Sequence, residues 1–289
     1  MGTIFKNSEA KQKILDWYEV YKKKITIPVE SIEVNTGFGK THILVGGPAN
    51  GEPIFLLHGA MASAAHVLSE LQYLMTKYRV YSIDVIGQSV KSEEKRISVK
   101  NNEYGSWLWE VIENLKVDKV NIIGVSWGGF VSIRAAVKVP GRINKFVLLI
   151  PAGVINGNPL KGIMKMAIPM YLYKRKPNSE TLTNFMKNLL TTVDDDWKDY
   201  MGDAFLCYNM DMTVPKLVSK KELTDFKTPV FVVAADGDIS FPGNKLIAQA
   251  KKIFPNIVKT ELLKNAKHSP PTTDTFRKWM SAQISDFIG

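Results

Sequence analysis

The chain has 289 residues, of which 45% are hydrophobic and 23% are charged, a balance typical of a globular protein with a large buried core. This composition excludes a disordered chain, and the length suits one α/β enzyme domain with an insertion. The formal net charge is +10, which could indicate binding to nucleic acid or to an anionic membrane surface. Because basic residues are spread along the chain and mixed with acidic ones, we expect neither partner.

The start of the chain carries charged residues too early for the apolar core of a secretory signal. The longest stretch without Asp, Glu, Lys or Arg lies between Glu52 and Glu70 and contains His58 and small polar residues, so we expect no stable membrane insertion. Cys207 is the single cysteine, which excludes an intramolecular disulfide. We therefore expect a cytoplasmic protein without a metal or an organic cofactor.

Apolar β-rich runs alternate with helical patterns along the chain. An amphipathic helix is expected over 8–24, and 31–47 indicates two antiparallel strands joined by a Gly-containing turn. Six further strands are expected at 53–59, 79–85, 120–125, 145–151, 229–235 and 258–263, with helices that include 103–115, 127–138 and 273–287. The pattern predicts an α/β fold with a mostly parallel, eight-stranded sheet covered by helices.

The regular spacing of strands breaks between Pro151 and Pro229. This stretch is rich in Met, Leu, Tyr and Lys, which favours a helical lid with an apolar face; a helical decoration packed on the core is the alternative. The basic runs at 22–24 and 174–176 are interpreted as solvated faces.

The predicted organisation has three parts. They are an N-terminal helical segment at 1–29, an α/β core formed by 30–151 and 225–289, and a helical lid at 152–224.

Ser126 lies in the sequence Gly-Val-Ser-Trp-Gly-Gly, directly after strand 120–125 and before helix 127–138. In a strand-to-helix turn, the glycines allow a sharp bend and remove side chains that would collide with neighbouring elements. The N-terminal N–H groups of the helix favour negative charge nearby. Ser126 is therefore the candidate nucleophile, and an ordinary turn serine is the alternative.

A serine hydroxyl needs a base, which is usually a histidine held by a carboxylate. Of the four histidines, His42, His58 and His66 lie in or beside early predicted elements, and only His268 follows Ser126. Because His268 lies in a loop after the last strand, it is the candidate base.

The carboxylate that orients His268 is expected in the loop VVAADGDISFP, which offers Asp236 and Asp238. Residues 146–178 contain no Asp or Glu, so the loop after strand 145–151 supplies none. We choose Asp238 and interpret Asp236 as a turn residue beside the intervening glycine.

Five motifs in this order resemble the α/β-hydrolase superfamily, and within it a group of lidded bacterial carboxylesterases. They are LLHGAMAS at 56–63, IDVIGQS at 83–89, GVSWGG at 124–129, AADGD at 234–238 and NAKHSP at 265–270. The chain departs from the family pattern where Ser89 and Lys91 replace a glycine and a serine, and where Ala235 replaces a glycine. None of these departures touches a candidate catalytic side chain.

The resemblance implies an oxyanion hole formed by the backbone N–H groups of Ala60 and Trp127, with Met61 open as an alternative to Ala60. Gly59 would let the backbone bend towards Ser126. The function expected is hydrolysis of small to medium carboxylic esters through an acyl-enzyme, with a small-molecule ester as partner.

Other functions remain compatible with the same residues. They are perhydrolysis, thioester cleavage, C–C bond hydrolysis, and service as a hydrolase-like small-molecule receptor. A serine at the turn disfavours reactions in which a carboxylate at that position is the nucleophile. The sequence predicts no particular oligomeric state.

Overall fold

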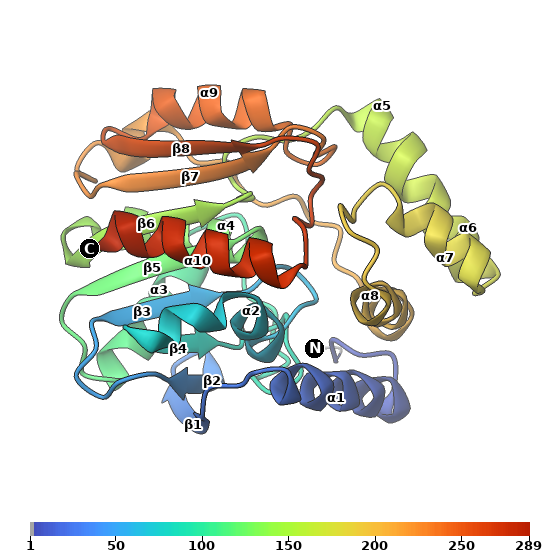
Figure 1. The fold of residues 1–289 in the computed structure, drawn as a ribbon, viewed down its shortest axis with the longest axis horizontal. Helices are drawn as coiled ribbons and strands as arrows, with labels where there is room; N and C mark the ends of the chain where they lie inside the picture. The colour runs from blue at the N-terminus through green and yellow to red at the C-terminus, as the bar shows by residue number, and fades with distance from the viewer. Residues whose placement is uncertain (1–2) are drawn as a thin grey trace.

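Eight strands form one sheet with helices on both faces in the computed structural model, which describes residues 3–289 (Figure 1). The strands are β1 (Val29–Thr36), β2 (Gly39–Gly46), β3 (Pro53–Leu57), β4 (Arg79–Ile83), β5 (Val120–Val125), β6 (Ile143–Leu149), β7 (Val230–Ala235) and β8 (Ile257–Leu263). Residues 1–2 of the predicted N-terminal segment lie outside the described residues.

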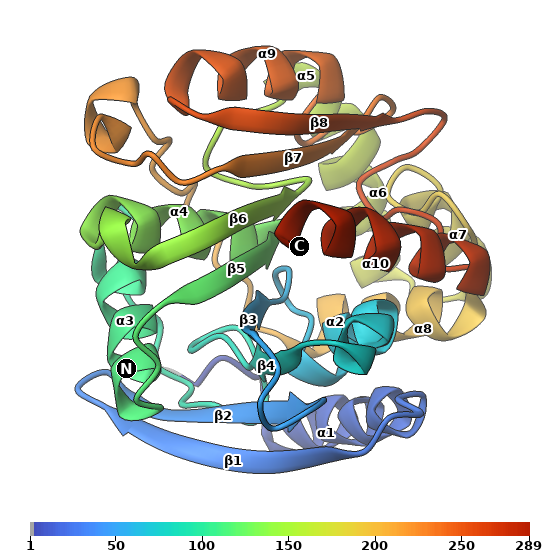
Figure 2. The same cartoon turned by 60° about the vertical axis from the view of Figure 1, so that its left-hand side comes forward.

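The strand order is β1-β2-β4-β3-β5-β6-β7-β8. β1 pairs antiparallel with β2 and β2 antiparallel with β4, while the six strands from β3 to β8, β4 included, run parallel to one another. The antiparallel edge lies at one end of the twisted sheet and β8 at the other (Figure 2). The predicted fold is confirmed, and the loops that follow the parallel strands meet along one edge of the sheet.

Six helices cover or flank the sheet. They are α1 (Ser8–Lys23), α2 (Ala64–Leu71), α3 (Glu103–Asn114), α4 (Trp127–Lys138), α9 (Gly243–Ile253) and α10 (Asp274–Ile288). Four of them, α1, α3, α4 and α10, agree well with the predicted ranges. Short turns of 3-10 helix lie at Gln72–Thr76, Pro140–Arg142 and Lys220–Leu223.

Side chains of alternate residues in the central strands pack into two hydrophobic cores, one on each face of the sheet. In β3, Ile54 and Leu56 belong to the core that includes α2 and α10, while Phe55 and Leu57 belong to the core that includes α3, α4 and α9. All four side chains are fully buried, and each contributes about 1.5–3 kcal/mol to folding. This double burial explains why the strands are continuously apolar in the sequence.

Between β6 and β7 the chain forms the helices of the insertion, beyond the carboxyl ends of the parallel strands (Figure 1). They are α5 (Pro159–Gly162), the π-helical turn η3 (Ile163–Ala167), α6 (Ile168–Arg175), α7 (Ser179–Met186) and α8 (Asp195–Cys207). α8 packs against α1, where Trp17 Nε1 donates to Asp203 Oδ2 over 2.8 Å and Lys13 forms an ion pair with the same carboxylate.

Candidate active site

Ser126 occupies the sharp turn between β5 and α4. Its backbone has φ 48° and ψ −109°, a strained conformation that few non-glycine residues adopt. A Cβ at Gly124 would lie 2.4 Å from Ser132 Oγ, and one at Gly128 would lie 2.2 Å from Leu57 O. The glycines thus permit close packing around the turn, and the serine itself adopts the left-handed conformation.

The structure brings Ser126, His268 and Asp238 together from three separate loops. Ser126 Oγ lies 2.9 Å from His268 Nε2, and His268 Nδ1 lies 2.8 Å from Asp238 Oδ2. Because the ionised carboxylate only accepts, Nδ1 carries the ring hydrogen and Nε2 is free to accept the serine proton. This arrangement can generate a serine nucleophile.

Asp238 is held for this contact by its own loop. Its second carboxylate oxygen accepts a hydrogen bond from Ser240 N over 2.7 Å, and its side chain is fully buried. Burial alone would raise the pKa of Asp238, but the charge and hydrogen bond of His268 hold it below its usual value. Asp236 is only half-buried, and its backbone N–H donates to Leu263 O.

The environment of His268 favours its protonated form. Burial lowers the pKa of the imidazole, but the charge and hydrogen bond of Asp238 outweigh burial and raise it above the ordinary histidine value. The side chain is 23% exposed, so it remains open to the cavity next to Ser126.

The loop after β3 lies beside the nucleophile. A Cβ built on Gly59 would stand 4.0 Å from Ser126 Oγ, and Gly59, Ala60 and Met61 all line the same cavity as Ser126. Met61 has φ 57°, a left-handed conformation that turns the chain at this point. The side chain of Trp127 packs on Tyr104 and Phe130.

A cavity of about 300 Å³ adjoins Ser126 and His268. Its walls are mostly apolar and include Val67, Leu71, Leu189, Met201, Phe205 and Met280. Glu70 and Arg277 also line it and pair through two hydrogen bonds of 2.8 and 2.9 Å. The space therefore suits a ligand that is apolar over most of its surface.

The segment before α8 and the first turn of α8 form hydrogen bonds to the loop that carries His268. Ser269 N donates to Leu189 O over 2.9 Å, Thr191 N donates to Ser269 O over 3.1 Å, and Trp197 Nε1 donates to Ser269 Oγ over 3.0 Å. The insertion thus fixes the position of the histidine loop, a role that the sequence pattern did not reveal.

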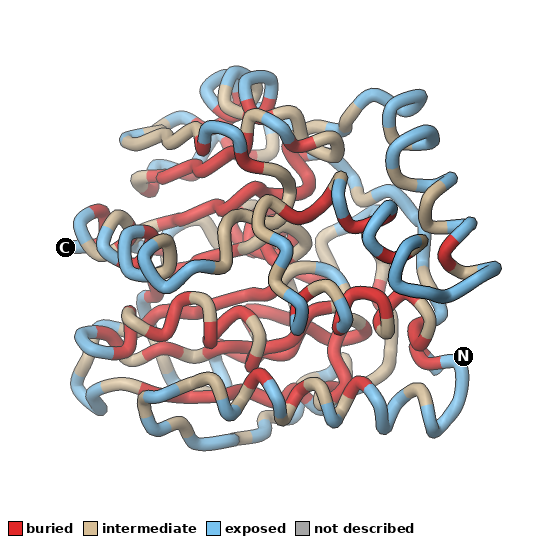
Figure 3. Tube along the Cα trace, turned by 45° about the vertical axis from the view of Figure 1, so that its right-hand side comes forward, coloured by how far each residue is buried: buried red, intermediate tan, exposed pale blue. Residues whose placement is uncertain are grey.

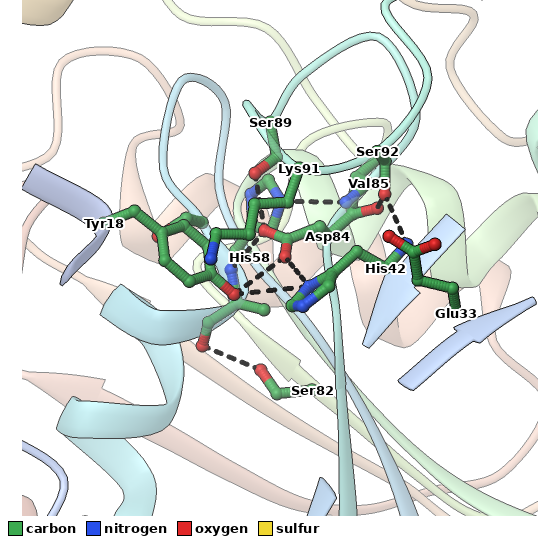
Figure 4. Close-up of polar contacts among 12 residues, drawn as sticks. Tyr18, Glu33, His42, His58, Ser82, Asp84, Val85, Ser89, Lys91 and Ser92 are labelled. Carbon is green, nitrogen blue, oxygen red and sulfur yellow. Dashed lines mark hydrogen bonds and ion pairs between the residues drawn. The ribbon is translucent and has the colours of Figure 1, made fainter. Parts of the chain in front are cut away.

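A second polar cluster is buried behind the loop after β3 and centres on Asp84. Its carboxylate accepts hydrogen bonds from Tyr18 Oη (2.9 Å), His42 Nδ1 (2.8 Å), Ala64 N (2.8 Å) and Ser89 Oγ. Figure 4 shows the Tyr18 and His42 rings converging on this one carboxylate. The cluster joins α1, β2, α2 and the loop after β4.

These bonds hold the ends of the loop that faces Ser126. Ala64 is the first residue of α2, and at the other end His58 donates from Nδ1 to Gly59 O and accepts from Val85 N at Nε2. Because Nε2 accepts a hydrogen bond, the His58 ring is neutral, and burial lowers its pKa in the same sense. Asp84 is the residue of the IDVIGQS motif whose function the sequence left unassigned.

His66 is also neutral. Burial, followed by nearby positive charge, lowers its pKa to about 3, and its ring stacks on Trp197 with centroids 3.9 Å apart. Within residues 3–289, no group of three or more His, Cys, Asp or Glu side chains is arranged to hold a metal ion. Over the same residues, no helix has the length and apolar character needed to cross a membrane.

Comparisons with known proteins identify the family of this chain. Residues 52–200, more than half of the chain, match the family described as alpha/beta hydrolase fold. Two Bacillus subtilis relatives are similar: the uncharacterized carboxylesterase nap (26% identical, covering 87% of this chain and 86% of the relative) and carboxylesterase YbfK (24%, covering 88% of each).

A solved structure shows the same fold. The crystal structure of naproxen esterase from Bacillus subtilis superimposes with a TM-score of 0.83 and 20% identity, covering 98% of this chain and all of that one. The chain therefore belongs to the α/β-hydrolase family, in which it is a carboxylesterase-like hydrolase.

Proposed function

We propose that this chain hydrolyses carboxylic esters of small to medium size through an acyl-enzyme formed on Ser126. One observation carries the proposal, the continuous hydrogen-bonded chain from Ser126 Oγ through His268 to the buried carboxylate of Asp238. The similarity to proteins named carboxylesterases supports the reaction class.

In the acylation half, Ser126 Oγ attacks the ester carbonyl while His268 Nε2 takes the hydroxyl proton. His268 then gives this proton to the departing alcohol, and Asp238 stabilises the imidazolium in between. The backbone N–H of Trp127 and that of Ala60, or of Met61 instead, donate to the oxyanion. Water repeats the cycle on the acyl-enzyme, releasing the acid and restoring Ser126.

The cavity supports the proposed substrate size. A space of about 300 Å³ lies at the lower end of the range for small-ligand pockets, and its apolar walls favour an uncharged acyl or alkyl group. We assign the role of lid to residues 152–224, because Leu189, Met201 and Phe205 from this stretch line the cavity. Residues 30–151 and 225–289 then form the core, and 1–29 form the N-terminal segment.

The test is hydrolysis of p-nitrophenyl acetate, butyrate, octanoate and palmitate, with the matching thioesters in parallel. We expect the highest kcat/KM on the short and medium oxygen esters and none above background in Ser126→Ala. Ser132→Ala, which changes a serine on the next helix, is the matched control. Full activity in Ser126→Ala, or turnover of thioesters alone, would overturn the proposal.

A further inference from the structure

The outward face of the helices at 160–175 differs from the rest of the surface, in that large apolar side chains stand open to solvent there. Their exposed fractions range from 48% to 71%, and they are Leu160, Ile163, Met164, Ile168, Tyr171 and Leu172. Steps of three and four residues place such side chains on one side of a helix. Figure 3 shows this part of the insertion as a mostly exposed arm.

The charges on the same segment all have one sign. Lys161, Lys165 and Arg175 are exposed within it, and Lys176 follows it directly. Lys174 is part-buried, with its Nζ 3.4 Å from Met210 Sδ. No Asp or Glu occurs from residue 146 to 179. Arg175 stacks over the ring of Tyr171, with 5.9 Å between the guanidinium carbon and the ring centroid. An apolar face flanked by cations is typical of helices that lie in the headgroup region of a membrane.

The inner side of this segment reaches the proposed active site. Met166, in the π-helical turn, lines the cavity beside Ser126, while its neighbours Met164 and Lys165 are exposed. Asn188 Nδ2 donates to Lys165 O over 2.9 Å and so satisfies a carbonyl in this irregular turn. One short turn therefore separates the cavity from the outer face.

We propose that the outer face of residues 160–175 binds the surface of an anionic phospholipid membrane. The apolar side chains enter the headgroup region, and the exposed cations Lys161, Lys165, Arg175 and Lys176 contact the lipid phosphates. The segment lies in the plane of the membrane, which brings the cavity wall formed by Met166 close to lipid-dissolved molecules.

Charge decides between the occupants of this face. A second copy of this chain in a symmetric dimer would bring the same cationic face against itself, which like-charge repulsion opposes. A nucleic acid would pair with the cations but would leave the six apolar side chains against phosphates and water. Of these three occupants, the anionic lipid surface is the one that satisfies both the charges and the apolar side chains.

The experiment is co-sedimentation of the full chain with vesicles of phosphatidylcholine, with and without one-third phosphatidylglycerol. We expect binding to the anionic vesicles that weakens as salt is raised, and little binding to the neutral ones. Lys161→Ala/Lys165→Ala should weaken partition about 25-fold, from roughly fivefold per lysine. Met164→Ser should weaken it by about fivefold through loss of apolar burial.

Matched controls lie elsewhere on the surface. Lys251→Ala/Lys252→Ala removes two exposed lysines from the last turn of α9, and Val258→Ser removes a side chain that is 62% exposed on β8. Both controls should bind as the wild type does. Thermal unfolding should be unchanged in all variants, because every substituted side chain is exposed.

Three results would overturn the proposal. They are equal binding to neutral and anionic vesicles, equal loss of binding in the controls, and a dimer in vesicle-free solution that Met164→Ser dissociates. Ser126→Ala should bind the vesicles normally, so failure of the ester-hydrolysis proposal leaves the membrane result unaffected.

Discussion

His268 lies 2.8 Å from Asp238, and His42 lies 2.8 Å from Asp84, so two histidine–carboxylate pairs with the same spacing occur in one chain. The first pair faces a cavity, and its free ring nitrogen meets Ser126. The second is sealed, with the His42 side chain only 5% exposed, and its carboxylate is shared with Tyr18 and two other donors.

The difference shows that spacing alone does not identify a catalytic pair. In both pairs, burial would raise the pKa of the carboxyl, and the histidine lowers it again. What separates them is the third partner, a strained serine in one and a set of structural donors in the other. We therefore expect catalysis to depend on Asp238 and folding to depend on Asp84.

Between the two carboxylates, the larger expected effect on turnover comes from Asp238→Asn. This change keeps the shape of the side chain but removes the charge that holds the tautomer of His268, so kcat should fall by about 10³ to 10⁴. The measurement is kcat on one activated ester, with circular dichroism to confirm folding. Asp236→Asn is the matched control and should cost about tenfold or less. If kcat fell steeply in Asp236→Asn and only slightly in Asp238→Asn, then Asp236 would be the carboxylate that orients His268.

The pH dependence of kcat/KM tests the role of His268, the histidine of the pair that faces the cavity. His268 must be neutral to accept the serine proton, and its pKa lies above the ordinary histidine value because Asp238 outweighs the effect of burial. We expect kcat/KM to rise with pH through a midpoint above about 6.5, falling about tenfold per unit below it. A profile that stays level from about pH 5 to 8 on a non-ionisable ester would contradict histidine as the base.

Asp84→Asn should lower stability and leave kcat largely unchanged, the reverse of the pattern expected for Asp238→Asn. Tyr18, His42 and Ala64 all donate to the carboxylate of Asp84. The amide of Asn would replace one accepting oxygen by an N–H₂ donor and leave a weaker acceptor in place of the other. The free energy of unfolding should therefore fall by about 2–4 kcal/mol. The folded fraction should keep kcat within about tenfold of the wild type. Denaturant unfolding and kcat measured on the same samples separate the two effects. An unchanged stability with a kcat loss as large as that of Asp238→Asn would break the comparison.

Local sequence was enough to predict the turn at Ser126 and the histidine that the structure places next to it. Ser126 lies in a strand-to-helix motif whose glycines have a packing reason, and His268 is the one histidine that follows it. The lack of acids in 146–178 indicated the loop that carries Asp236 and Asp238, and the structure places Asp238 against His268. The strands were predictable because burial on both faces makes them continuously apolar.

Long-range contacts were not predictable in this way. The Asp84 cluster joins residues from four separate elements, and its contacts depend on strand order and on the docking of α1. The hydrogen bonds to Ser269 likewise join two segments that are far apart in the chain. In the insertion, apolar residues occur on more than one side of the helix, so the sequence did not reveal that Met164 and Leu172 face outward.

The central claim is that Ser126 is a nucleophile activated by His268, and covalent labelling tests it most directly. A fluorophosphonate probe should modify one serine per chain, and peptide mapping by mass spectrometry should place the label on Ser126. Labelling should be absent in Ser126→Ala and unchanged in rate in Ser132→Ala. Stoichiometric labelling of the folded Ser126→Ala protein, or a label on another serine in the wild type, would contradict the account.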